Sequence, residues 1–261
     1  MLHILQRHPV PVRAMFRRSL VLTYAVPASF LRPHLPCGLD LDEMDGLGFL
    51  AIAMVQTRSL RPVGLPAALG RDFFLAGYRI FARWRHPDGR VLRGLRILRS
   101  DTDARLMVLF GNLLTHYRYQ MASVKLVEEP GGFHVNVRTK DGLGDLDLVA
   151  QLASDAVGLP EGSPFRDLRH ARLYAGPMPF TFDHEPETDS IIVIEGVREA
   201  WRPRPIEVEV RRVGFLDQPM FKNAGAKLAN AFVVENVPYL WKRGMRYRIP
   251  QTDIPAKKER D

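Results

Sequence analysis

Two turn sequences that lie between strand-like runs constrain the fold of this chain most strongly. Pro-Asp-Gly at 87–89 separates the runs 78–85 and 90–98. Proline presets the backbone of a turn and glycine permits a positive φ, so these runs are predicted to form an antiparallel hairpin. A second hairpin is predicted from residues 121–128, 130–132 and 133–139, with Pro-Gly-Gly as its turn.

Hydrophobic periodicity predicts further strands and few helices. Strands are expected at 19–25, 49–56, 191–197 and 206–213, where apolar and β-branched residues alternate or run together. Helices are expected between residues 101 and 117, at 165–174 and at 220–232. Many strands with two or three helices are typical of a mostly β (α+β) fold, in which an antiparallel sheet closes into a barrel or curves strongly.

The length of the chain favours one domain. Its 261 residues, of which 46% are hydrophobic, suffice for one large β-rich core. The proline- and glycine-containing stretches at 58–70 and 158–164 are too short and too apolar to mark a convincing domain boundary. We therefore expect a single domain over 1–250 and a basic tail over 251–261.

The charge and the cysteine content limit which binding partners and which cellular compartment we expect. The formal net charge is +8, but the arginines are spread along the chain and no nucleic-acid motif accompanies them. A solvated basic face explains them better than a binding patch. No apolar run reaches the length of a membrane-spanning helix. Neither nucleic acid nor membrane is therefore expected as a partner, a homo-oligomer stays open, and the single Cys37 fits a reducing cytoplasm.

The common catalytic and cofactor motifs are absent. The chain has no Gly-x-Ser-x-Gly sequence, no phosphate-binding loop and no His-x-x-x-His pair, so neither a metal nor a cofactor is expected. Asp183, His184 and Glu185 could bind a metal or act as acid and base. A polar turn ahead of Pro186 is the simpler interpretation of these three residues.

Several segments, in order, carry a family resemblance. They are Leu-Pro-Cys-Gly-Leu at 35–39, the strand 73–81, the segment 117–126, Ala-Gly-Pro-Met-Pro-Phe at 175–180 and Trp-Arg-Pro at 201–203. Together they resemble an uncharacterised branch of the acetoacetate decarboxylase-like superfamily, over most of the chain. The resemblance implies the same curved β fold, with a ligand pocket inside it.

The resemblance also implies that the decarboxylase reaction is lost. That reaction needs a lysine that forms a Schiff base with the ketone of the substrate. Tyr119 and Gln120 stand where the family has its lysine pair, Leu75 replaces a supporting glutamate, and Ala25 replaces a pocket arginine. Lys125, on the following strand, is expected at the surface. We therefore assign no catalytic residue.

The pocket itself is expected to remain as a ligand site. Arg79 matches an arginine of the family and would face the interior, where it could receive a ligand carboxylate or phosphate. The predicted ligand-binding residues are Arg79, His116, Tyr117, Tyr119 and Gln120. A structural ion pair for Arg79, or an outward-facing strand, is the alternative.

Three functions follow from these expectations. The first is a small-molecule-binding protein whose ligand is a small organic acid. The second is an enzyme of altered chemistry, such as a lyase or hydratase, that uses Tyr119 or His116 as acid or base. The third, a basic module for nucleic acid or anionic lipid, lacks the interleaved aromatic and basic residues that such modules carry.

Overall fold

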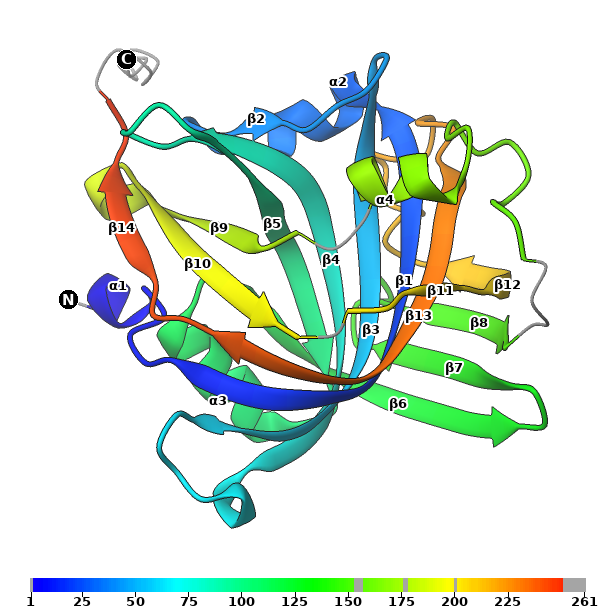
Figure 1. Cartoon of the computed structure of the whole chain (residues 1–261), viewed down its shortest axis with the longest axis horizontal. Helices are drawn as coiled ribbons and strands as arrows, with labels where there is room; N and C mark the ends of the chain where they lie inside the picture. The colour runs from blue at the N-terminus through cyan, green and yellow to red at the C-terminus, as the bar shows by residue number, and fades with distance from the viewer. Residues whose placement is uncertain (1, 153–156, 176–177, 200, 251–261) are drawn as a thin grey trace.

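The computed structural model describes residues 2–152, 157–175, 178–199 and 201–250. Within them a ring of seven strands forms the body of the molecule (Figure 1). Its strands are β1 (Val12–Pro27), β3 (Leu47–Pro62), β4 (Arg71–Arg85), β5 (Val91–Thr102), β9 (Phe180–Glu185), β10 (Ser190–Arg198) and β13 (Lys227–Trp241). The short strands are β2 (Asp40–Leu41), β11 (Arg204–Pro205) and β14 (Met245–Arg248).

The ring is closed, although it is not a regular barrel. Six of its seven junctions are antiparallel, and the β1–β3, β1–β13, β3–β4 and β4–β5 pairings are long. The β5–β9 junction is parallel, and both it and the β10–β13 junction span only three residue pairs. The predicted mostly β architecture is therefore confirmed, with a parallel junction that the sequence analysis did not anticipate.

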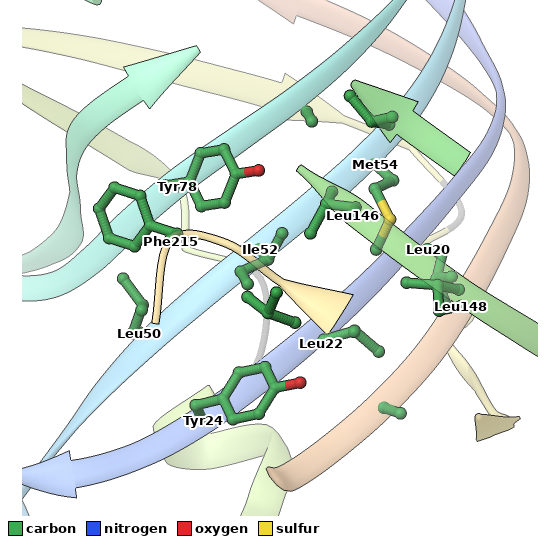
Figure 2. Close-up of a cluster of buried hydrophobic side chains, with 14 of the residues drawn as sticks. Leu20, Leu22, Tyr24, Leu50, Ile52, Met54, Tyr78, Leu146, Leu148 and Phe215 are labelled. Atoms are coloured by element: carbon green, nitrogen blue, oxygen red, sulfur yellow. The ribbon is translucent and has the colours of Figure 1, made fainter. Parts of the chain in front are cut away.

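A second sheet covers one outer face of the ring. It consists of β6 (Tyr119–Glu129), β7 (Gly132–Thr139), β8 (Leu146–Gln151) and β12 (Glu207–Val213), and β6 joins it to β5 by a short parallel pairing. Side chains from β1, β3, β4 and β8 meet between the two layers (Figure 2). Tyr78 packs against Phe215 there, and its hydroxyl donates to the Gly144 carbonyl oxygen at 2.9 Å.

The inner face of the ring is also apolar. Phe49, Ala51, Ala53 and Phe81 lie on it, on the opposite side of β3 and β4 from the residues of Figure 2. The helix α4 (Leu168–Ala175) contributes Ala171 to this inner cluster. Because the central parts of β1, β3 and β4 are covered on both faces, residues 20–26, 47–55 and 73–78 are almost continuously hydrophobic instead of alternating with polar residues.

Both predicted hairpins are confirmed. β4 pairs with β5 and β6 pairs with β7, each antiparallel. Gly89 and Gly131 have φ values of 89° and 78° in the two turns, which explains the need for glycine there.

Two of the three predicted helices are confirmed and the third is wrong. α3 (Arg105–Leu114) and α4 form where helical spacing predicted them. The segment 220–232 instead makes turns up to Gly225, whose φ is positive, and then enters β13. Pairing with β1 on one side outweighs the weak helical pattern of this segment. Two further helices, α1 (Leu2–Leu5) and α2 (Ala28–Leu31), have only four residues each, and single 3-10 turns occur at Arg32–His34, Ala67–Leu69 and Pro186–Thr188.

None of the helices in the described chain is long and apolar enough to cross a membrane. The predicted basic tail, 251–261, lies outside the described residues.

The core between the two sheets gives a direct test of the fold. Leu148 of β8 has no exposed surface, so Leu148→Ala should lower the free energy of unfolding by about 2–5 kcal/mol. Leu173→Ala, on α4, is the matched control because 57% of Leu173 is exposed, and its effect should stay within about 0.5 kcal/mol. Urea unfolding of both variants measures the difference, and equal effects would contradict the two-layer arrangement.

Candidate ligand site

Arg79 lies on the inner face of the ring. Strand register places Thr23, Ala51, Arg79 and Ile97 side by side on β1, β3, β4 and β5. The neighbouring level on β3 and β4 holds Ala53 and Gly77. Small side chains therefore surround the long side chain of Arg79, which lies back along its own strand toward Gly77.

The guanidinium of Arg79 has no partner among the described residues. No hydrogen bond or ion pair joins it to another side chain or to the backbone, and its Nε is buried without an acceptor. Part of the side chain nevertheless keeps accessible surface. Burial lowers the pKa of Arg79 from its ordinary value, while nearby tyrosines act in the opposite direction.

The other partly or fully buried arginines of the ring strands have ion-pair or hydrogen-bond partners. Arg99 bonds to Asp101 and Asp141, Arg83 bonds to Asp42, and Arg96 bonds to Asp183. An unpaired guanidinium on the inner face therefore sets Arg79 apart within the described residues, since a buried cation normally has an anionic partner.

Three tyrosines surround this cation. Tyr117, Tyr119 and Tyr239 are close enough to Arg79 to interact with it electrostatically. Tyr117 and Tyr119 pack against Ile97, the cross-strand neighbour of Arg79. Burial raises the pKa of Tyr117 well above its ordinary value and raises the pKa of Tyr119 to about 12. These hydroxyls therefore stay protonated near neutral pH and can donate hydrogen bonds. The Tyr117 hydroxyl is buried without a partner in the described part of the chain.

Tyr239 was not among the residues predicted from the sequence. It follows Arg79 by 160 positions in the chain and reaches the site because β13 closes the ring beside β1 and β10. Its ring packs on Gly196 of β10, where a Cβ atom would lie 2.1 Å from the tyrosine hydroxyl. Period-2 alternation through β13 could have placed Tyr239 on the inner face, but part of that segment was predicted as helix.

His116 joins a buried carboxylate at the edge of the site. Asp183 accepts hydrogen bonds from the His116 backbone N–H and from Nδ1, both at 3.0 Å, and also from Arg96. The prediction of a polar turn at 183–185 is therefore wrong. These residues belong to β9, and Asp183 and Glu185 are 1% and 0% exposed. Buried carboxylates are stable in a strand here because each has a charged partner.

Opposing effects set the charge of this pair. Burial disfavours the imidazolium, but the hydrogen bond to Asp183 and the charge of that carboxylate outweigh it, so the pKa of His116 is raised above 6.5. Burial also disfavours the Asp183 anion, yet His116 and Arg96 lower its pKa overall. His116 therefore remains cationic to a higher pH than a free histidine. Its Nε2 is buried and has no partner among the residues that the structure describes.

Gln120 and the lysines lie elsewhere. Gln120 is exposed, although Tyr119 beside it packs inward, so strand alternation separates the two. The described lysines, which are Lys125, Lys140, Lys222, Lys227 and Lys242, are all exposed. Leu75 and Ala25 provide no charge at the inner face.

A shallow hollow formed within residues 158–169 contains none of the site residues. No group of three or more His, Cys, Asp or Glu side chains in the described part of the chain could hold a metal ion.

The His116–Asp183 pair predicts a pH-dependent contribution to stability. His116→Gln keeps a hydrogen-bond donor but loses the positive charge. A hydrogen bond to a charged group contributes about 1.5–3 kcal/mol to the free energy of unfolding. Because the folded-state pKa of His116 is raised, this contribution is fully present below 6.5 and is lost as the pH rises through the raised value. Urea unfolding should therefore separate wild type from variant at about pH 5.5 and much less at about pH 9. An equal difference at both pH values would contradict the pair.

Comparison with known proteins agrees with this architecture. The sequence profile of the DUF2071 family, described as an uncharacterized conserved protein, matches residues 13–238. No curated protein sequence matches the chain significantly.

Solved structures with the same fold are only distantly related in sequence. Acetoacetate decarboxylase from Legionella pneumophila is 12% identical, with a TM-score of 0.60 over 92% of this chain and 88% of that chain. An acetoacetate decarboxylase-like enzyme from Sphingomonas wittichii RW1 is 15% identical, with a TM-score of 0.57 over 94% and 95%. The enduracididine biosynthesis enzyme MppR, complexed with pyruvate, is 12% identical, with a TM-score of 0.52 over 91% and 88%. The chain therefore belongs to the DUF2071 family of uncharacterized conserved proteins and has an acetoacetate decarboxylase-like fold.

Proposed function

We propose that this protein binds a small organic acid inside the ring, beside Arg79, and that it has no Schiff-base chemistry. The observation that carries the proposal is the unpaired guanidinium of Arg79 on the inner face. An isolated buried cation costs several kcal/mol because it loses its hydration. A carboxylate ligand would remove that cost by supplying the missing anion.

The tyrosines support an anionic ligand with further oxygen atoms. Near neutral pH, protonated hydroxyls at Tyr117 and Tyr119 add hydrogen-bond donors near the guanidinium without adding negative charge, and Tyr239 adds a third hydroxyl. Such donors bind carboxylate, ketone or hydroxyl oxygens. MppR, which has the same fold, was solved with the small carboxylate pyruvate, and this is the class of ligand that we propose here.

The positions of the lysines support the loss of imine chemistry. A Schiff-base lysine must be enclosed with its substrate and have a lowered pKa. Tyr119 lies inside, at the position where the resemblance expects a lysine, whereas the described lysines are exposed. We therefore propose a binding site made of Arg79, Tyr117, Tyr119 and Tyr239, with His116 at its edge and Gln120 outside it.

We further propose that residues 1–250 form one domain and, from the lone Cys37, that the protein is located in the cytoplasm.

A second candidate function is acid–base catalysis in the same site. Asp183 orients His116 through Nδ1 and leaves Nε2 without a partner, an arrangement that recurs where histidine transfers protons. It favours the lyase or hydratase alternative over any reaction that needs an amine.

The binding proposal predicts ligand stabilisation that depends on Arg79. Acetoacetate or pyruvate at about 100 times its Kd should stabilise the wild-type protein by about 2.7 kcal/mol, which is several degrees in Tm. Arg79→Met should lose this stabilisation, and the ligand-free variant should be more stable because an unpaired buried cation is removed. Arg85→Met is the matched control, since Arg85 is exposed at the end of the same strand. Unchanged ligand stabilisation of Arg79→Met in a thermal-shift assay would refute the site.

Catalysis can be separated from binding by one NMR experiment. When acetoacetate is incubated with the protein in deuterated water, binding alone should give neither acetone nor enzyme-dependent exchange of the carbon-bound protons. Exchange that occurs with the wild-type protein and disappears in His116→Gln would support the acid–base function instead of the binding function. Formation of acetone above the buffer rate would contradict the loss of decarboxylase chemistry.

A further inference from the structure

Gly77 has a close contact that its backbone conformation does not require. Its φ is not in the positive range that favours glycine. Glycine within a strand is unfavourable compared with other residues, so its presence usually marks a close approach of another group. Here that group is the guanidinium of Arg79, two residues along the same strand.

The distances define which edge of the guanidinium faces Gly77. A Cβ atom on Gly77 would lie 3.0 Å from Nε, 3.0 Å from Nη2 and 3.4 Å from Cζ of Arg79. Because the central carbon is farther away than both nitrogens, the position lies beyond the Nε–Nη2 edge and not above the face of the group. The Cα of Gly77 is one bond away from that position, so this edge rests against the strand backbone.

This contact closes one of the two forks with which arginine binds carboxylates. Side-on binding uses the N–H groups of Nε and Nη2, whereas end-on binding uses Nη1 and Nη2. A carboxylate at the side-on fork would overlap the Gly77 backbone. The burial of Nε without an acceptor agrees with this, and the side chain as a whole still keeps accessible surface.

We infer that the ligand anion binds end-on, through Nη1 and Nη2 of Arg79, and that Gly77 is the positioning residue that enforces this mode. The inference rests on the proposed binding function. Gly77 supplies no contact to the ligand. It lets the Nε–Nη2 edge of the guanidinium lie against β4, so that the Nη1–Nη2 end is the one left to bind the anion.

A matched pair of glycine variants tests the positioning role. In Gly77→Ala the methyl group must displace the guanidinium, whose flexible side chain can move, so the variant should fold with a Tm close to wild type. Its affinity for acetoacetate, measured by calorimetry, should fall at least tenfold. Gly158→Ala is the control because no atom lies within 4 Å of its added Cβ and its φ is not positive, and it should keep wild-type affinity.

A second measurement reads the binding mode in the unaltered protein. In a 15N-labelled sample, end-on binding of acetoacetate should slow rotation of the Arg79 Nη groups and leave its Hε resonance nearly in place. Arg79→Lys assigns the signals by their disappearance. A large Hε shift on titration, or wild-type affinity in Gly77→Ala, would overturn the end-on mode while leaving the binding function intact. If no acid binds the wild-type protein, the proposed function fails, and this inference fails with it.

Discussion

Burial of β1, β3 and β4 on both faces is the constraint on which the rest of this structure depends. The second sheet covers their outer face and the closed ring encloses their inner face. Water then reaches little of either face, so a polar side chain there must have a protein partner or a ligand. For each polar group on the inner face, the partner that compensates its burial must therefore be identified.

Asp183 is such a group, and it has several partners. Asp183 accepts hydrogen bonds from Arg96 of β5 and from His116. These bonds hold in place the segment that contains Tyr117. Arg79 differs because its neighbours in the described chain are mostly small residues and tyrosines, and none of them is a carboxylate. The inner face of this acetoacetate decarboxylase-like fold thus carries a cation with tyrosine hydroxyls near it.

Local chemistry explains why some elements could be predicted and others could not. The hairpins around Gly89 and Gly131 depend on turn dihedrals that neighbouring residues specify. The segment that became β13 carries a weak helical pattern, and only its pairing with β1, more than 200 residues earlier, makes it a strand. Asp183 resembles a turn residue in the sequence because its partners, Arg96 and His116, are distant along the chain.

The sequence by itself determined the mostly β architecture, the set of β4 residues that share a face with Arg79, and the absence of a lysine at position 119. Each of these follows from residue identity and from the two-residue period of a strand, which are local properties. Only the tertiary structure decided that Arg79 has no partner among the described residues and that Tyr239 lies near it. The position of Tyr239 depends on ring closure, because closure brings β13, which lies far from β4 in the sequence, to the same inner face as Arg79.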